Sequence, residues 1–322
     1  MEEFMPPPAI CCPGCDAALE LNGVAAFTKI TCPECATEIN VPLRFDRYLL
    51  DRVCGRGGMS RVYVGSDTEL FRPVAIKVLQ PQANGEVNEQ QFLSEARLVT
   101  RLNHPGFVPI YDCGVWRGCP FLVMKYMAKG NLESMLKKRQ LPGTRVMANH
   151  LANIAEGLMM LHKNGFAHHD IKPGNILMDD QDHAALADFD LMANANQGDT
   201  GAAESWVSPA YSSPERLYNG YEDHRGDIFS LGITAYELLT GQPPFELKGE
   251  PRYLYEQRKH PLFLPAHDLN PELSETTSKL LNRMLAFQPA ERPAYPEIVS
   301  TLRKEAEDRN RGFFARLFGK NK

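Results

Sequence analysis

The stretch that decides the fold is His168-His-Asp-Ile-Lys-Pro-Gly-Asn-Ile-Leu177, followed by Ala187-Asp-Phe-Asp190. Asn175 comes five residues after Asp170, and Asp188 comes thirteen residues after Asn175. Carboxylate and amide oxygens are the hard ligands that Mg²⁺ prefers beside phosphate groups. A separate carboxylate can orient an attacking hydroxyl or accept its proton. The pattern therefore indicates a site that handles phosphate together with a divalent metal ion.

Two upstream stretches supply further groups that could bind phosphate. Val53-Cys-Gly-Arg-Gly-Gly-Met-Ser-Arg-Val62 predicts a glycine-rich turn between two strands, where backbone N–H groups can approach phosphates. Lys77 ends the β-branched run 74–79 at Val-Ala-Ile-Lys, and burying an ammonium is costly unless it is paired. Glu95, within the helix-patterned segment 89–102, is the candidate partner. Alone, the turn would be unremarkable, and each charge would be read as a solvated surface group.

Taken together, the motifs resemble those of eukaryotic-type protein kinases over residues 48–305. The catalytic-loop wording Asp-Ile-Lys-Pro-Gly-Asn is similar to the Ser/Thr class, and the glycine loop is similar to that of bacterial Ser/Thr kinases. The resemblance implies an α+β, two-lobed fold with a β-rich N-lobe (48–124) and a helical C-lobe (128–305). It also implies a protein serine/threonine kinase in signalling, which transfers the γ-phosphoryl group of ATP to protein hydroxyls.

The resemblance assigns a role to each matching residue. It implies a phosphate loop lined by Gly55, Gly57 and Ser60, and an adenine pocket between Val62 and Ala75. Lys77 would hold the α- and β-phosphates. The gatekeeper position is Met124, the hinge runs from Lys125 to Met127, and Asn131 stands where a contact to the ribose is common. The catalytic set consists of the base Asp170, the charge stabiliser Lys172, and Lys77 paired with Glu95. Asn175 and Asp188 are the implied ligands of Mg²⁺ or Mn²⁺. Three structural residues complete the pattern, with Glu215 pairing with Arg292 and Asp227 anchoring the catalytic loop.

Three positions depart from the family pattern. His169 replaces the arginine that receives the activation-loop phosphate, and histidine is a poorer, pH-dependent cation. We therefore expect weak or no dependence on loop phosphorylation. Asp190 replaces the glycine after Asp-Phe, which adds a negative charge near the metal site and reduces backbone freedom. Ser60 replaces the third glycine of the loop, a mild change.

None of these changes removes a group that performs chemistry, so the sequence predicts an active enzyme. An ATP-binding pseudokinase scaffold, with the N-terminal segment and tail recruiting partners, is the alternative, and a small-molecule kinase is a third possibility. Ser208 stands where the resemblance implies a contact with the catalytic Asp and Lys, in a peptide-docking segment that argues for protein substrates. Thr200 and Ser205 are candidate autophosphorylation sites, or simply solvated hydroxyls of the loop.

Five of the eight cysteines lie in the first 35 residues. Cys12-Pro-Gly-Cys15 and Cys32-Pro-Glu-Cys35 match the spacing of a four-cysteine zinc site, so residues 11–41 resemble a zinc ribbon with a structural Zn²⁺. A redox pair or chance remains the alternative reading of one such motif. Cys11 is a spare thiol that could replace Cys12 in a poorer register. Residues 1–10 are expected to form a disordered lead, and 42–47 a short linker; no internal repeat is visible.

Composition limits the partners and the compartment. Of 322 residues, 43% are hydrophobic and 23% charged, which is ordinary for a globular protein. The net charge of -5, with only Lys29 between the cysteine pairs, gives no case for nucleic-acid binding. The start lacks the pattern of a secretory signal, so a cytoplasmic location is predicted. The tail 306–322 carries a basic, aromatic segment, 309–322, that could dock on an anionic membrane or a partner, pack as a terminal helix, or fray. Nothing indicates the oligomeric state.

Overall fold

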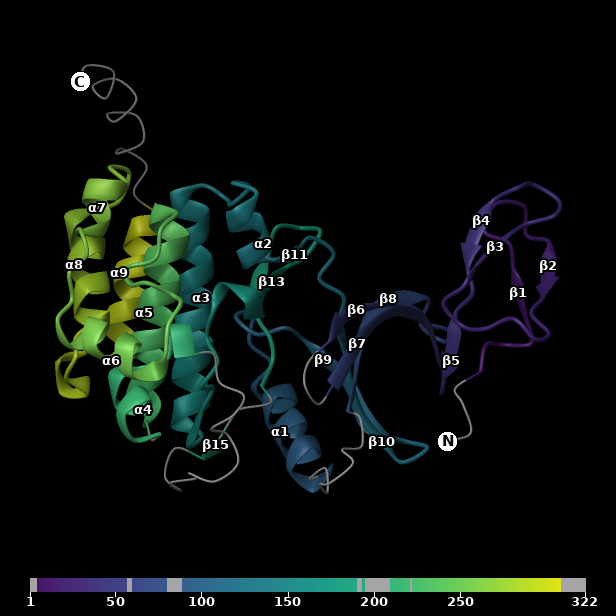
Figure 1. The fold of residues 1–322 in the computed structure, drawn as a ribbon, viewed down its shortest axis with the longest axis horizontal. Coiled ribbons are helices and arrows are strands. Elements are labelled where there is room, and N and C mark those ends of the chain that lie inside the picture. Colours follow the sequence, from purple (N-terminus) through teal and green to yellow (C-terminus); the bar gives the residue numbers. More distant parts are fainter. Residues whose placement is uncertain are drawn as a thin grey trace, which may run out of the picture. The chain divides into compact units, whose positions relative to one another are not determined.

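The computed structural model describes residues 5–56, 60–79, 89–189, 193–194, 209–220 and 222–307, with the main chain alone at 56, 89–91, 94–95 and 193–194. It divides into two compact units, shown in Figure 1. The first comprises residues 1–100 and 109–126, and the second comprises 101–108 and 127–322. The first is rich in strands and the second in helices, as the sequence predicts for the two-lobed kinase fold.

Two short hairpins begin the first unit. Their strands, three residues each, are β1 (Ala9–Cys11), β2 (Ala18–Glu20), β3 (Lys29–Thr31) and β4 (Glu38–Asn40). Ala9 pairs with Glu20 and Lys29 pairs with Asn40, so the second hairpin repeats the first at an offset of 20 residues. The sequence reading missed this repeat, because the matching positions are mostly different residue types outside the Cys-Pro-x-Cys turns.

A six-stranded antiparallel sheet forms the rest of the first unit, in the order β5-β6-β7-β8-β10-β9. Its strands are β5 (Leu43–Phe45), β6 (Tyr48–Arg56), β7 (Ser60–Asp67), β8 (Arg72–Leu79), β9 (Ile110–Trp116) and β10 (Cys119–Lys125), with α1 (Glu89–Leu102) between β8 and β9. The predicted strand runs 62–64 and 74–79 fall in β7 and β8, and the predicted helix 89–102 is α1. Apolar side chains that alternate along these strands make the core, among them Phe45, Tyr48, Leu50, Ile76 and Phe121.

The segment expected to be a linker, 42–47, contains β5. Leu43 and Phe45 are buried while Arg44 between them is exposed, so the strand extends the sheet with one apolar face. The hairpins also pack on this sheet. The ring of Phe27 stacks on Tyr63 with centroids 5.9 Å apart, and Asn40 Nδ2 donates to Asp51 O at 3.1 Å. The cysteine-rich segment is therefore part of the first unit rather than a tethered head.

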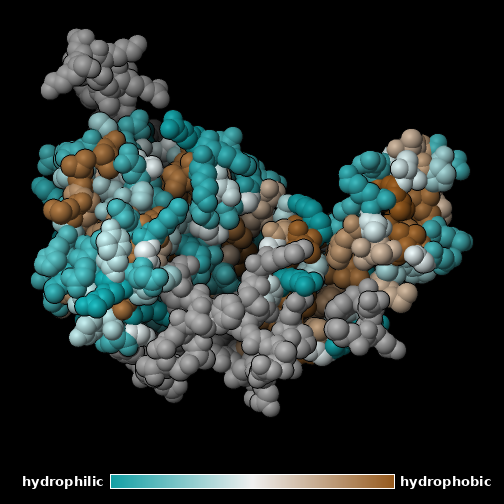
Figure 2. Space-filling view, in the orientation of Figure 1, coloured by the Kyte–Doolittle hydropathy of each residue, from teal (hydrophilic) through white to brown (hydrophobic). Residues whose placement is uncertain are grey.

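Helices form most of the second unit. They are α2 (Leu132–Lys137), α3 (Thr144–Lys163), α4 (Pro214–Asn219), α5 (His224–Thr240), α6 (Pro251–Lys259), α7 (Ala266–Leu269), α8 (Glu275–Met284) and α9 (Tyr295–Glu307). Every residue of α5 from Gly226 to Leu239 is buried, as expected of a central helix that is surrounded by other elements. Helix α3 packs against α5 and α9 (Figure 1). The helical part of the face in Figure 2 is mostly hydrophilic, and many apolar side chains of this unit are buried.

Short strands hold the loops of the second unit. They pair as β11 (Gly130–Asn131) with β13 (Ile176–Met178), β13 with β14 (Ala184–Leu186), and β12 (Phe166–Ala167) with β15 (Ala193–Asn194). The stretch 168–175 thus runs between β12 and β13, and the pairing of these strands with β15 and β14 holds its two ends. No helix in the described part of the chain is long and apolar enough to cross a membrane.

Candidate active site and thiol cluster

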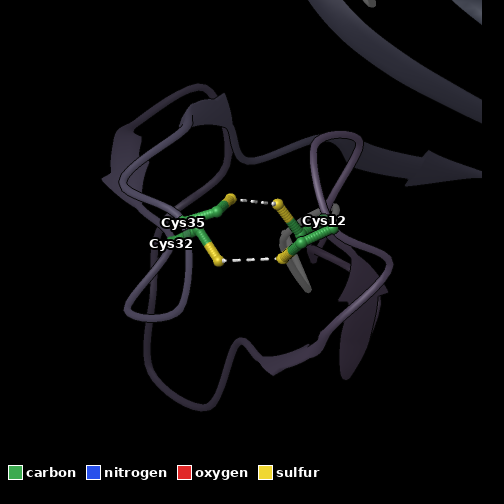
Figure 3. Close-up of side chains that lie close together, drawn as sticks. Cys12, Cys32 and Cys35 are labelled. Carbon is green, nitrogen blue, oxygen red and sulfur yellow. Dashed lines mark hydrogen bonds between the residues drawn. The ribbon is translucent and has the colours of Figure 1, made fainter.

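Four thiols of the two hairpins face one another (Figure 3). The sulfur atoms of Cys12 and Cys35 are 3.5 Å apart, those of Cys15 and Cys32 are 3.7 Å apart, and all four lie within 4.8 Å of one another. A tetrahedral zinc ion with Zn–S distances of about 2.3 Å requires sulfur separations of about 3.8 Å. A disulfide requires about 2.05 Å. The cluster is therefore compatible with zinc, and Cys11, exposed on β1, lies outside it.

Each Cys-Pro-x-Cys turn is closed by the same backbone hydrogen bonds. Asp16 N donates to Cys12 O at 2.9 Å, and Ala36 N donates to Cys32 O at 3.0 Å. Both donors have left-handed φ angles, 60° and 62°. Hydrogen bonds from the side chain and backbone of Thr37 lower the pKa of the Cys35 thiol to about 6, which favours the thiolate that a metal ion binds. The hydrogen bond at the Ala17 backbone alone would lower the pKa of Cys15, but hydrogen bonds with the other thiols outweigh it and raise the pKa to about 12, so the thiols differ in how readily they ionise before a metal ion binds.

In the second unit, Asp170 is held by two neighbours in its own loop. Lys172 Nζ donates to both of its carboxylate oxygens, at 2.9 and 2.8 Å. Asn175 Nδ2 donates to its carboxylate and to its main-chain oxygen, both at 2.8 Å. The 3₁₀ turn Pro173–Asn175 brings Asn175 back toward Asp170. The result is a nearly buried, oriented carboxylate with an ammonium group beside it.

Asp227, on the first turn of α5, holds the start of this loop. Its carboxylate accepts hydrogen bonds from His168 N at 2.7 Å and His169 N at 2.8 Å, and lies 2.8 Å from His162 Nε2. Full burial alone would raise the pKa of Asp227, but the hydrogen bond and charge of His162 lower it well below its usual range. Asp227 is therefore ionised, and it fixes two consecutive amides just before Asp170.

The candidate metal ligands Asn175 and Asp188 lie on neighbouring chain segments. Ala187 N donates to Asn175 O at 2.8 Å, which ties the residue before Asp188 to Asn175. The hydrogen bonds from Asn175 to Asp170 use Nδ2 and none of the lone pairs of its side-chain oxygen. Asp188 is exposed and adopts a left-handed φ of 68°. The donor set, one amide oxygen and one carboxylate, fits Mg²⁺ in chemistry.

The predicted nucleotide-binding residues of the first unit lie on four adjacent strands. Val62 on β7 pairs with Gly55 on β6 and with Lys77 on β8, and Ala75 on β8 pairs with Met124 on β10. The Lys77 side chain is buried, with 6% of the residue exposed. The main chain of Glu95 lies in α1, as predicted. Ser60 begins β7 and is buried.

The predicted hinge runs out of β10 into the second unit. Lys125 N donates to Pro109 O at 2.9 Å, and Gly130 N donates to Met127 O at 3.1 Å. Asn131 caps α2, since its Oδ1 accepts a hydrogen bond from Ser134 N at 2.9 Å. This capping role was not foreseen for Asn131. An Asn followed by a helical pattern is the signal that could have suggested it.

Glu215 and Arg292 form a two-fold hydrogen-bonded ion pair. Arg292 Nη1 and Nη2 donate to Glu215 Oε1 and Oε2, each at 2.7 Å. The guanidinium also donates to main-chain oxygens of Ala286 and Arg225, so it joins four segments of the second unit. The side chain of Glu95 and the residues Gly57, Asp190, Thr200, Ser205 and Ser208 lie outside the described part of the chain, as does the tail segment 308–322.

Comparison with known families agrees with this geometry. The family model described as "Protein kinase domain" matches residues 48–302. The chain belongs to the protein kinase family. The predicted fold class and the resemblance to bacterial Ser/Thr kinases are thereby confirmed, and the two units correspond to kinase lobes.

The chain is similar to curated bacterial kinases. It is 40% identical to the serine/threonine-protein kinase PknL of Mycobacterium tuberculosis over 204 residues, 62% of this chain and 50% of PknL. It is 37% identical to the probable serine/threonine-protein kinase pknA2 of Bifidobacterium longum over 205 residues, 62% of this chain and 27% of that protein. It is 33% identical to the DNA damage-responsive serine/threonine-protein kinase RqkA of Deinococcus radiodurans over 252 residues, 77% of this chain and 37% of RqkA. The chain spans half or less of the length of these relatives.

One contact of this kinase domain was missed in the sequence. His169, which replaces the family arginine, has its Nδ1 atom 2.9 Å from Oε1 of Glu222, a buried residue between α4 and α5. The two residues are 53 positions apart, and Glu222 belongs to no motif that the sequence displays. No local pattern could have paired them.

Proposed function

We propose that the protein is an ATP-dependent protein serine/threonine kinase. The observation that carries this proposal is the arrangement of Asp170, whose carboxylate is held by Lys172 and Asn175 while Asp227 fixes the two preceding amides. Such an arrangement suits a group that orients a hydroxyl for attack and accepts its proton. Membership of the family and the names of the relatives support the same activity.

The chain's own residues divide the work of transfer. Bound Mg²⁺·ATP supplies an electrophilic γ-phosphoryl group whose charge is partly neutralised. Asp170 orients the substrate Ser or Thr hydroxyl in line with that phosphorus, and Lys172 stabilises negative charge close to it. Lys77, paired with Glu95, holds the α- and β-phosphates. Asn175 and Asp188 hold the metal ion through their side-chain oxygens.

The remaining features complete the proposal. The kinase domain spans 48–305, with the ribbon 11–41 before it and Cys12, Cys15, Cys32 and Cys35 holding a structural Zn²⁺. A thiolate cluster of this kind suits a reducing compartment, which supports a cytoplasmic site of action. The substrates are proteins, and the tail segment 309–322 docks on a membrane or a partner.

The test is transfer of label from [γ-³²P]ATP to a generic basic protein in the presence of Mg²⁺, followed by mapping of the phosphorylated residues. We expect phosphoserine or phosphothreonine with the wild type and a loss of at least about a hundredfold in rate with Asp170→Asn. Asp180→Asn, an exposed carboxylate ten residues away, is the matched control and should keep the wild-type rate. Equal rates for the wild type and Asp170→Asn would refute the proposal. Thermal stabilisation by ATP without transfer would favour the pseudokinase alternative.

A further inference from the structure

A single buried carboxylate gathers three partners from two segments of the second unit. Glu222, 5% exposed, lies between α4 and α5. Its Oε1 atom is 2.9 Å from His169 Nδ1 and accepts a hydrogen bond from Arg216 Nη1 at 2.9 Å. Its Oε2 atom accepts a hydrogen bond from Ser213 Oγ at 2.5 Å. Glu222 thus connects the catalytic loop with helix α4 and its N-cap.

The charge of Glu222 follows from these partners. Burial alone would raise the pKa of its carboxyl, but the hydrogen bond and charge of His169, then Arg216 and Ser213, hold it below the usual range. An ionised carboxylate can only accept hydrogen bonds. His169 therefore donates through Nδ1 whether its ring is neutral or charged, so the contact fixes the position of the ring.

The main chain of His169 adopts an unfavourable conformation. Its φ angle is 66°, in the left-handed region that is costly for a residue other than glycine. Such a conformation persists where the surroundings hold it on several sides. Asp227 accepts the amide of His169 at 2.8 Å, and Glu222 holds the ring. The next residue along the chain is Asp170.

Helix α5 leaves room for this carboxylate. A Cβ atom on Gly226 would lie 2.0 Å from Glu222 Oε2 and 2.3 Å from its Cδ. The glutamate cannot withdraw from such an atom without breaking the hydrogen bonds to His169, Arg216 or Ser213. Glycine in the first turn of α5 is therefore matched to the presence of Glu222.

We propose that Glu222 is a positioning residue for phosphoryl transfer, which fixes the direction of Asp170 by holding the imidazole of His169. The inference rests on the proposed kinase activity. A displacement of about 1 Å at a reacting group can reduce a rate by about a hundredfold. In the described part of the chain, none of the hydrogen-bond partners of Glu222 is assigned to ATP, so its loss should change the chemical step and leave ATP binding intact.

The first experiment compares Glu222→Gln with Glu305→Gln under steady-state conditions. Glu305 is the matched control, because it is also 5% exposed and accepts hydrogen bonds from Ser274 and Thr277 away from the catalytic loop. We expect Glu222→Gln to lower kcat about ten- to a hundredfold with little change in the KM for ATP. Glu305→Gln should lower the melting temperature and keep kcat.

Three further variants separate positioning from stability. His169→Phe, which keeps a ring but loses the donor, should lower kcat as much as Glu222→Gln does. The kcat of the double variant should be no lower than that of either single variant. His169→Arg, which keeps a donor opposite Glu222, should retain most of the kcat. Gly226→Ala should improve helix propensity yet lower kcat, because it displaces the carboxylate without removing it.

Amide hydrogen exchange of the peptide 166–172 gives a readout that needs no activity. We expect faster exchange in Glu222→Gln and His169→Phe than in the wild type or Glu305→Gln. If the wild type transfers no phosphate, the proposed function fails, and this comparison still decides the role of Glu222. If Glu222→Gln does not fold, His169→Phe takes its place. Unchanged kcat together with unchanged exchange would overturn the inference.

Discussion

At the scale of single residues, Asp227 anchors the start of the catalytic loop. It accepts the amides of His168 and His169 and is fully buried and ionised. Asparagine would remove the charge and turn an N–H₂ group toward these donors. We expect Asp227→Asn to lower the free energy of unfolding by about 3 kcal/mol at pH 7. Urea denaturation measures this loss. Asp223→Asn, at the half-buried N-cap of the same helix, keeps an oxygen that accepts the hydrogen bond from Arg225 N and should cost less than about 1 kcal/mol; equal costs would contradict the prediction.

His168 gives the fold a pH dependence of its own. Burial lowers its pKa, and the nearby charges of Asp227 and Asp170 offset this only in part. The folded state therefore favours the neutral ring, whose stabilising contribution is complete above the unfolded pKa of about 6.5 and is lost as the pH falls. His168→Asn keeps an acceptor near Asp170 N but does not titrate. Its unfolding free energy should fall less steeply between pH 7.5 and 5.5, by up to about 1.4 kcal/mol per pH unit. A slope as steep as that of the wild type would exclude His168 as the source, and the exposed His183→Asn controls for loss of a histidine.

At the scale of elements, long patterns were predictable and short ones were not. The helix over 89–102 and the strand over 74–79 each carry enough periodic apolar residues to be read directly. Strand β5 has only three residues, Leu43–Phe45, and its alternation becomes meaningful only beside β6. The repeated hairpins escaped notice for the same reason, since three-residue strands leave too few positions for similarity to show.

The β6–β7 hairpin, which flanks the glycine-rich loop, depends on a close approach of two backbones. A Cβ atom on Gly65 would lie 2.2 Å from Leu49 O and 3.0 Å from the Leu50 Cα. Because backbone atoms cannot swing aside as side chains do, Gly65→Ala should destabilise the protein by about 1–3 kcal/mol. Thermal unfolding measures the effect, and Ser66→Ala on the same strand is the control. A melting temperature of Gly65→Ala equal to that of the control would show that the strands separate at little cost.

At the scale of the whole molecule, the sequence predicted what lies close along the chain. Asp170, Lys172 and Asn175 fall within six residues, so one loop brings them together. The contact of His169 with Glu222 depends on tertiary packing, and a substitution at the family arginine gave no hint of the new partner. The packing of Phe27 on Tyr63 is likewise visible only in the folded chain.

The same packing links the thiol cluster to the stability of the first unit. The hairpins have a small core of Cys12, Leu19, Cys32 and Ile39, so we expect a bound metal ion to supply much of their stability. Their faces contact β6 and β7 through Asn40 and Phe27. We expect about one zinc per chain by elemental analysis. Cys32→Ser should lose the zinc and lower the melting temperature by about 5 °C or more, while Cys11→Ser, outside the cluster, should keep both. Full zinc content in Cys32→Ser would show that Cys32 is not a ligand. An unchanged melting temperature after loss of the zinc would show that the hairpins contribute nothing to the stability of the sheet.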